Sequence, residues 1–285
     1  MPSVETIIDH LRLFRPNRHS ALGDGWEVIA SESKLDIDSS RLDAFHRVCP
    51  GWRDLDHLPP TYPQLAAASA HLKLLGTKGF PFHPMGLVHV TNEIEQKRPI
   101  HRDESLHVMT SVGPGGAHEK GRLIEVLTEI RSTSGEIPWR SRATALKMES
   151  ARPSIRPSPK EKPLSDTWRD SMTTRVDLEE NLGRLYGDVA GDLNPIHQRA
   201  WLAKPFGFSR HIIHGTWTLA WALHPIVSGH SHYRLEAHFR RPVPLPSSLH
   251  ATTRPTDDGQ EVRVWQKSLW KPALEIKLAF LARSS

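Results

Sequence analysis

The stretch from Arg98 to His107, RPIHRDESLH, returns late in the chain as RPVPLPSSLH, from Arg241 to His250. The two segments share five identities in ten positions, and Ile100 is exchanged for Val243. They lie 143 residues apart (241 − 98 = 143), which is close to half of the 285-residue chain. Self-similarity at a fixed offset indicates a repeated structural unit. We therefore interpret the chain as a tandem duplication.

A second, weaker match supports the same interpretation. Residues 45–51 resemble residues 186–192 at an offset of 141 (186 − 45 = 141), with an aromatic residue followed by valine three positions later in both segments. Three loosely similar positions arise easily by chance, so this match alone is not decisive. Its offset agrees closely with that of the longer match.

Each half predicts the same order of elements. Thr61–Leu75 has helical composition, with Gly76 as a stop signal. Gly215–Val227 is apolar on almost every side, which predicts a buried helix, and Pro225 is expected to mark its end. Strand-like runs follow both helices, and a Gly-Pro-Gly-Gly hairpin loop is expected at 113–116. The runs are Met85–Ile94, Ser105–Val112, Arg122–Ser132 and Arg142–Met148 in the first half, and Tyr233–Arg240, Ser248–Arg254, Glu261–Leu269 and Ala273–Ala282 in the second.

These elements predict an α+β fold in which an antiparallel sheet wraps a central helix, twice over. The segment 151–166 contains four prolines and is interpreted as a linker. It separates an N-terminal half, residues 1–150, from a C-terminal half, residues 167–285. Residues 1–25 alternate polar and apolar side chains, which favours an amphipathic helix or arm packed on its own domain over a docking segment.

Composition excludes several classes of protein. Lys and Arg number 37 against 32 Asp and Glu, and this net charge of +5 is dispersed rather than clustered, which disfavours a nucleic-acid binder but suits a phosphorylated ligand. The one cysteine, Cys49, excludes an intramolecular disulfide and favours a cytoplasmic setting. The sequence contains no apolar stretch long enough to predict a membrane-spanning helix.

The densest polar cluster lies just before the second central helix. Asp192, Asn194 and His197 fall within six residues, and Pro195 biases Asn194 toward extended backbone, so a loop is expected. A carboxylate beside a histidine is the minimal pair for moving protons near neutral pH. Asp-x-Asn-Pro is also an ordinary turn sequence, so spacing alone leaves both interpretations open.

The wider segment resembles the signature of the MaoC-like dehydratases, the (R)-specific enoyl-CoA hydratases of the hotdog fold. The matching pattern is Gly-Asp-x-Asn-Pro-x-His, preceded by a tyrosine and followed by a Gly-Phe loop and a His-Gly pair. Its residues here are Tyr186, Gly191, Asp192, Asn194, Pro195, His197, Gly207, Phe208, His214 and Gly215. The close match runs from Tyr186 to Gly215, and the duplicated architecture is similar to that of the double-hotdog members.

The resemblance implies a hydro-lyase that interconverts trans-2-enoyl and (3R)-hydroxyacyl thioesters. Asp192 and His197 would hold and polarise water, and Asn194 would fix their geometry. Gly215 and Thr216, at the start of the helix, would bind the thioester carbonyl, where free N–H groups and the helix dipole favour negative charge. The family implies no cofactor, a coenzyme A or carrier-protein thioester as substrate, and a homodimer. Two support positions differ from many family members: Ala190 replaces a serine, and Gln198-Arg199 stands where an aspartate follows the histidine.

The first half lacks these residues. At the offset of 141, Asp192, Asn194 and His197 correspond to Gly51, Arg53 and Asp56, so we expect the N-terminal half to be non-catalytic. Its helix is rich in small residues (Ala66, Ala67, Ala68, Ser69 and Ala70), which either leave room for an acyl chain or merely allow close packing.

Other functions are weaker alternatives. A hotdog thioesterase would usually have a carboxylate on the central helix, and 215–227 contains none. A non-catalytic acyl-thioester binding protein remains an alternative. The pairs His211/His214 and His230/His232 do not belong to a recognised zinc spacing, so we expect no metal. Arg240 and Arg241 either meet phosphates of the carrier or are solvated charges at a strand end.

Overall fold

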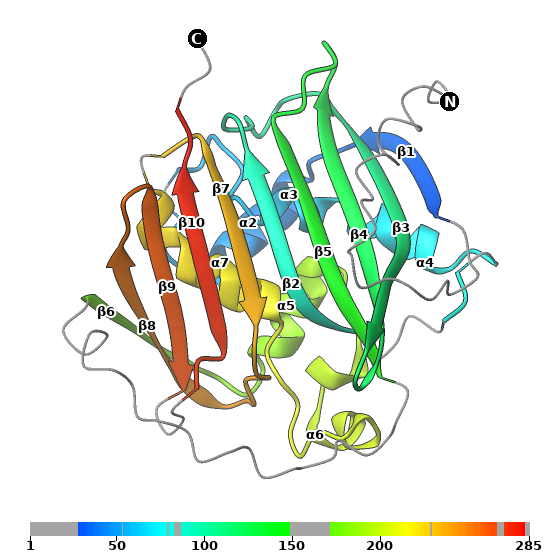
Figure 1. Ribbon diagram of the computed structural model, residues 1–285, viewed down its shortest axis with the longest axis vertical. Helices are drawn as coiled ribbons and strands as arrows, with labels where there is room; N and C mark the ends of the chain where they lie inside the picture. The colour runs from blue at the N-terminus through cyan, green and yellow to red at the C-terminus, as the bar shows by residue number, and fades with distance from the viewer. Residues whose placement is uncertain are drawn as a thin grey trace.

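Ten antiparallel strands form one sheet in the computed structural model, which describes residues 28–52, 54–78, 80–82, 87–148, 172–228, 230–266 and 271–282. The expected N-terminal arm (1–25) and linker (151–166) lie outside these residues. Figure 1 shows β1 and β6 at the two edges and β2 beside β7 at the centre. The strands are β1 (Ile29–Leu35), β2 (Leu87–Gln96), β3 (Leu106–His118), β4 (Gly121–Ser132), β5 (Trp139–Met148), β6 (Met172–Leu178), β7 (Tyr233–Phe239), β8 (Ser247–Pro255), β9 (Gly259–Gln266) and β10 (Leu274–Phe280).

The two halves of the sheet arrange their five strands in the same chain order when each half is read from its edge to the centre. It runs β1-β3-β4-β5-β2 in one half and β6-β8-β9-β10-β7 in the other. Where the halves meet, Glu93 of β2 lies directly opposite Glu236 of β7. These positions are 143 residues apart (236 − 93 = 143), which is the offset of the sequence repeat. A residue facing its own counterpart marks a pseudo-twofold axis, and the tandem α+β fold is confirmed.

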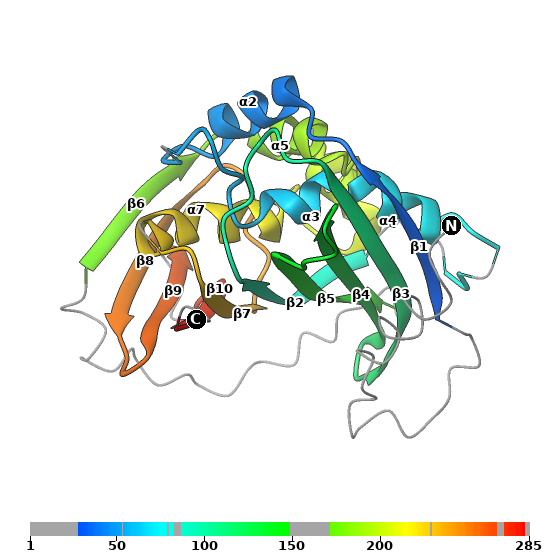
Figure 2. The ribbon, with the colours of Figure 1, turned by 90° about the horizontal axis from the view of Figure 1, so that it is seen from above.

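The helices lie on one face of the sheet, which curves around them (Figure 2). α2 and α5 pack against each other where the two halves meet. No helix in the described part of the chain is long and apolar enough to cross a membrane. The helices are α2 (Ser39–Val48), α3 (Tyr62–Ala66), α4 (Ala68–Leu75), α5 (Leu182–Ala190), α6 (Ala200–Ala203) and α7 (Gly215–Val227), with short 3-10 turns η2 (Pro195–His197) and η3 (Lys204–Phe206).

The central helix of the second half is confirmed, with α7 covering Gly215–Val227 and continuing past Pro225. The single helix expected over Thr61–Leu75 is instead two helices, α3 and α4, because Ala67 has a ψ of 0° and interrupts the regular backbone. The expected hairpin loop at 113–116 is wrong. These residues lie inside β3, which absorbs them with a bulge between Pro114 and Gly116.

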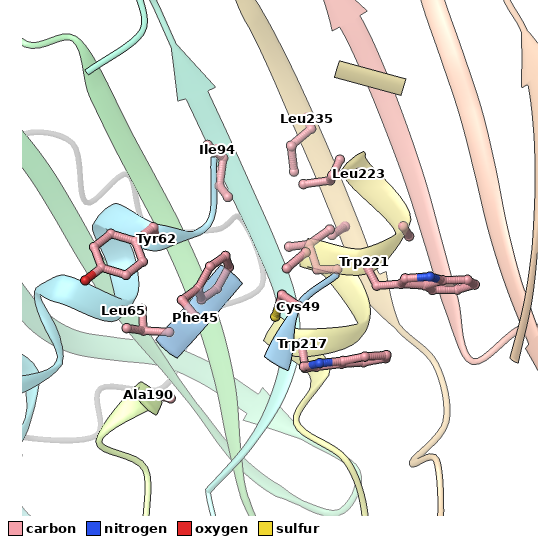
Figure 3. Packing of buried hydrophobic residues seen from close by; sticks show 14 of the residues in the cluster. Phe45, Cys49, Tyr62, Leu65, Ile94, Ala190, Trp217, Trp221, Leu223 and Leu235 are labelled. Atoms are coloured by element: carbon pink, nitrogen blue, oxygen red, sulfur yellow. The ribbon is translucent and has the colours of Figure 1, made fainter. Parts of the chain in front are cut away.

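The two halves share one hydrophobic core beneath the centre of the sheet. Figure 3 shows Tyr62, Phe45 and Cys49 of the first half in the same buried cluster as Trp217 of α7. Phe45 packs against Tyr62 at a centroid distance of 5.4 Å, and the side chains of Phe45, Tyr62 and Trp217 are fully buried. The Trp217 indole N–H also donates to the carbonyl of Val48 at 2.7 Å. Trp217 and Trp221 stack with nearly parallel rings and are both buried, so these tryptophans are packing residues. This shared core fixes α7, and therefore the site at its N-terminus, against the first half.

Candidate active site

Asp192 follows directly from the end of α5. Gly191 has a φ of +71°, a left-handed conformation that glycine adopts without strain, and it ends the helix. The Asp192 N–H then donates to the carbonyl of Gly187 at 3.0 Å. This turn presents the Asp192 carboxylate to a cavity. The side chain is 48% exposed, so substrate or water in the cavity can reach it.

His197 ends the 3-10 turn η2 and is 7% exposed. Its Nδ1 lies 2.8 Å from the carbonyl oxygen of Ile212. A carbonyl only accepts hydrogen bonds, so Nδ1 carries the proton and Nε2 of the neutral ring carries the lone pair. The ring is therefore held in the tautomer that leaves Nε2 free to act as a base.

His214, the residue before α7, brings a third ionisable group to the site. Its ring stacks on that of His197, with centroids 3.6 Å apart. Its Nε2 lies 3.4 Å from the Asp192 carbonyl oxygen and 3.6 Å from Asp192 Oδ2. The Tyr186 ring lies against the same imidazole, at a centroid distance of 5.0 Å. The sequence motif included His214 but did not indicate this contact with Asp192 and His197.

Burial and charge set the protonation states. Burial raises the pKa of Asp192, but the facing His214 and His197 and the N–H of Asn194 hold that pKa below its usual value on balance. Burial lowers the pKa of His197, and the Asp192 carboxylate offsets only part of that effect. Burial lowers the pKa of His214 to about 3. At neutral pH the site therefore contains one carboxylate and two neutral imidazoles.

Asn194 contacts the pair through its backbone. Its N–H donates to Asp192 Oδ1 at 3.1 Å, whereas its side-chain amide donates to the carbonyl of Leu87 in β2 at 3.4 Å. The backbone N–H of Asn194 thus orients the Asp192 carboxylate, and its side chain hydrogen-bonds the loop to β2 of the first half. Its side-chain oxygen is buried and has no hydrogen-bond partner within the described ranges.

Gly215 and Thr216 open α7 beside the same cavity. α7 begins without a side-chain cap, so the N–H groups of its first turn remain available to a ligand. A methyl group on Gly215 would come within 2.8 Å of the Phe239 ring. The absence of a side chain at Gly215 therefore lets the aromatic wall of the cavity pack directly on the start of the helix.

The cavity has a volume of about 630 Å³ and is lined by both halves of the chain. α4 and β5 of the first half form part of its wall, and the second half contributes the motif residues. This volume falls within the range of small-molecule sites, about 300–1,000 Å³. A ligand that reaches Asp192 therefore extends against the N-terminal half.

Two site residues were missed by the sequence analysis. His89 of β2 lines the cavity, and burial lowers its pKa although the charge of Asp192 acts to raise it. Arg41 of α2 donates to the carbonyls of Val189, at 2.6 Å, and Leu65, at 3.0 Å. It thereby fastens the end of α5 that precedes Asp192. Neither residue belongs to a local motif, because both reach the site across the interface between the halves.

The first-half counterparts of the motif do not form a second cluster of this kind. Gly51 packs under the His224 ring, and Asp56 is exposed. Arg53 lies outside the described residues. In the part of the chain that the structure describes, neither Gly51 nor Asp56 lines the cavity.

Among the residues that the structure describes, one group of three brings together donor atoms that could hold a metal ion. One donor atom from each of Asp192, His197 and His214 lies within 4.8 Å of the other two. His211 is not part of this group, and its Nε2 lies 2.7 Å from the Glu180 carbonyl oxygen. The group therefore differs from the His211/His214 pair that the sequence analysis considered and set aside. The expectation that the protein uses no metal stays a prediction.

One family model and two curated proteins are similar to this chain. A family model described as a MaoC like domain matches residues 157–268. The 3-hydroxyacyl-thioester dehydratase X of Mycobacterium tuberculosis is 29% identical over 230 residues, which cover 80% of this chain and 81% of that protein. Peroxisomal enoyl-CoA hydratase 2 of Arabidopsis thaliana is 29% identical over 204 residues, or 67% of this chain and 64% of that protein.

Solved structures are also similar to this chain. The crystal structure of HtdX from Mycobacterium tuberculosis has a TM-score of 0.76 and 26% identity, covering 90% of this chain and 100% of that one. A second Mycobacterium tuberculosis protein, described as having a double hotdog fold, has a TM-score of 0.55 at 11% identity, covering 91% of this chain and 96% of that one. The second similarity bears on the fold alone.

Proposed function

Since the chain carries a MaoC-like dehydratase domain over residues 157–268, we propose that it is a hydro-lyase of acyl thioesters. Its homologues are named 3-hydroxyacyl-thioester dehydratase and enoyl-CoA hydratase. The reaction is the (R)-specific hydration of trans-2-enoyl thioesters and the reverse dehydration of (3R)-hydroxyacyl thioesters. The observation that carries the proposal is the placement of Asp192 and His197 together on one cavity at the start of α7.

Asp192 and His197 share the proton transfers in this proposal. The ionised carboxylate and the free Nε2 of His197 hold the water that adds to the β-carbon, and between them they move its proton and the α-proton. General acid–base catalysis of this kind requires groups whose protonation states are correct near the working pH. The neutral His197 and ionised Asp192 meet that requirement.

Gly215 and Thr216 are assigned to the thioester carbonyl. Negative charge builds on this oxygen as the α-proton leaves, and uncapped N–H groups at a helix N-terminus stabilise such charge. The position of α7 supports this role, because the helix begins one residue after His214.

The N-terminal half is proposed to shape the acyl pocket rather than to catalyse. Ala68 of α4 lines the cavity, together with apolar side chains of β4 and β5. Ala67, by contrast, is fully buried in the core and does not line the cavity. Of these two small residues, Ala68 therefore leaves room for an acyl chain, whereas Ala67 allows close packing in the core.

The substrate carrier is proposed to be coenzyme A or an acyl carrier protein. Arg240 and Arg241 line the cavity, and cations there suit carrier phosphates. Arg240 also pairs with Glu275 at 2.7 Å, so its charge is partly compensated.

We further propose a cytoplasmic homodimer. Cys49 is free and buried, which is compatible with a reducing compartment, and light scattering of the purified protein tests the dimer.

The reaction is tested with Asp192→Asn and His197→Gln, assayed by loss of enoyl absorbance with crotonyl-CoA. Each substitution should lower kcat/KM by about 10²-fold or more. Asp188→Asn, an exposed aspartate on α5, and His107→Gln, a surface histidine on β3, are matched controls. Near-normal turnover in either site variant would contradict the assignment. Release of free thiol would indicate a thioesterase instead, and binding without conversion a non-catalytic protein.

A further inference from the structure

One face of the helical segment from Thr61 to Leu75 lines the cavity. Positions three or four residues apart share a helix face, and the lining residues of this segment follow that spacing. Most of that face is apolar, as an acyl pocket requires. It also contains three polar side chains, which we call the polar patch: Thr61, Gln64 and His71.

Thr61 has no hydrogen-bond partner for its hydroxyl among the described residues. The residue is 4% exposed and stands at the N-cap of α3, yet its side chain does not cap the helix. A buried hydroxyl without a partner costs free energy. A ligand atom that hydrogen-bonds this hydroxyl would remove the cost.

Gln64 and His71 are each held by one described hydrogen bond. Asn92 donates its amide N–H to Gln64 Oε1 at 2.7 Å, which fixes the Gln64 side chain with its own amide group still able to donate. His71 Nε2 lies 2.8 Å from the Thr128 hydroxyl. Both side chains are therefore held in place while keeping hydrogen-bonding capacity.

The polar patch is uncharged. Burial lowers the pKa of His71 to about 4, and its neighbour His89 acts in the same direction, so the His71 ring is neutral at neutral pH. A carboxylate placed here would find no cation within the patch, and burying an unpaired charge is strongly unfavourable. A purely apolar chain would leave the Thr61 hydroxyl unpaired. A neutral oxygen group matches the polar patch best.

We propose that the preferred acyl group carries a hydroxyl or carbonyl oxygen remote from the thioester, which binds at the polar patch. This inference rests on the proposed function, because it concerns the acyl chain of the same substrate. It narrows the substrate class from acyl thioesters in general to oxygen-substituted ones.

The test is a panel of trans-2-enoyl-CoA thioesters of increasing length, each prepared unsubstituted, with a terminal hydroxyl, with a keto group next to the end, and with a terminal carboxylate. At one or more lengths the hydroxyl or keto compound should exceed its unsubstituted counterpart in kcat/KM by about tenfold or more. The carboxylate series should be disfavoured. If unsubstituted or carboxylate chains are preferred at every length, the inference is overturned.

Thr61→Val removes the hydroxyl with little change in shape, and it should reduce the preference for the oxygenated chain to near unity. Thr252→Val removes a buried threonine hydroxyl from β8, away from the cavity, and should leave the preference intact. An unchanged preference in Thr61→Val, or an equal loss in both variants, would contradict the role of Thr61. Crotonyl-CoA separates the two proposals: if it is not hydrated, the proposed function itself fails.

Discussion

The imidazole rings of His197 and His214 stack face to face, with centroids 3.6 Å apart and planes inclined by 22°. Two protonated rings at this distance would repel each other, and burial keeps both pKa values below the usual histidine value. Since His214 also lies 3.6 Å from the Asp192 carboxylate, it contacts both members of the proposed acid/base pair. His214 is thus placed to act as a positioning residue.

His214→Phe keeps a stacking ring but removes the nitrogen that faces Asp192, whereas His214→Gln keeps an N–H donor and loses the ring. We expect kcat to fall about 10- to 100-fold in His214→Phe with little change in KM, because groups that orient catalytic residues have effects of this size. His214→Gln should retain more activity. Steady-state kinetics of both variants check the ranking, and the reverse order would show that ring stacking, rather than the nitrogen, matters.

The pH dependence of kcat/KM should show an acid limb below pH 6.5. Burial lowers the pKa of His197 from its reference value of 6.5, and the facing histidines and the Asn194 N–H hold the pKa of Asp192 below its own reference value of 3.8. Activity is therefore full above the His197 pKa and is lost as protonation of His197 removes its free lone pair. A rate profile with crotonyl-CoA measures the limb. An acid limb centred above pH 6.5 would contradict the neutral-histidine arrangement.

Stability should also fall in acid, because the unfolded chain binds protons that the folded state excludes. His214 has a pKa of about 3 when folded and a reference value of 6.5, so its contribution to stability is present above pH 6.5 and is lost as pH falls toward 3. At pH 5 the loss from this group is about 2 kcal/mol. Urea unfolding at pH 5 and pH 7 measures it. His214→Phe should lose less stability between these values, and an equal loss would contradict the assignment.

Local composition was enough to predict some parts of the fold. The bounds of α7 follow from an apolar run that is flanked by polar loops, and the offset of 143 reappears in the pairing of Glu93 with Glu236. The strands β1 and β6 were not predicted. They lie at the edges of the sheet, and β1, IASESKL, has polar residues at four of its seven positions and only one buried residue, Leu35. Edge strands often lack the apolar run that marks a buried strand.

Some residues of the site could likewise be predicted from the sequence, and others could not. Asp192 and His197 lie in one short loop, so their sequence spacing already brings them near each other. His89 and Arg41 come from β2 and α2, more than a hundred residues away, and only the pairing of the two halves places them at the site. Sequence spacing likewise did not distinguish Ala67 from Ala68, because the packing of the helical segment against the sheet decides which of its faces lines the cavity: Ala68 lines it, and Ala67 is buried in the core.

That difference between neighbours gives a matched pair of variants. Ala68→Leu adds volume inside the cavity, and we expect kcat/KM for the longest accepted chain to fall about tenfold relative to crotonyl-CoA. Ala67→Leu overpacks the core and should lower the free energy of unfolding by about 1–3 kcal/mol without shifting chain-length preference. Kinetics across chain lengths and urea unfolding separate the two effects. Unchanged preference in Ala68→Leu would argue against the acyl pocket.

Gly215 offers a way to separate packing from substrate contact at the start of α7. Inside a helix, propensity alone favours alanine over glycine by about 1 kcal/mol, so the glycine has another reason to be there. A methyl group at Gly215 would lie 2.8 Å from Phe239 Cδ1 and 2.9 Å from Cε1, which forces the ring to move within the cavity wall.

We therefore expect Gly215→Ala to lower kcat/KM for crotonyl-CoA about tenfold or more, since it displaces the wall beside the helix N–H groups. The double variant Gly215→Ala/Phe239→Leu relieves the contact and should recover most of the loss, with Phe239→Leu alone as its reference. If the double variant stays as impaired as Gly215→Ala, the methyl group obstructs the thioester itself. The glycine would then be required for ligand approach and not for the packing of Phe239.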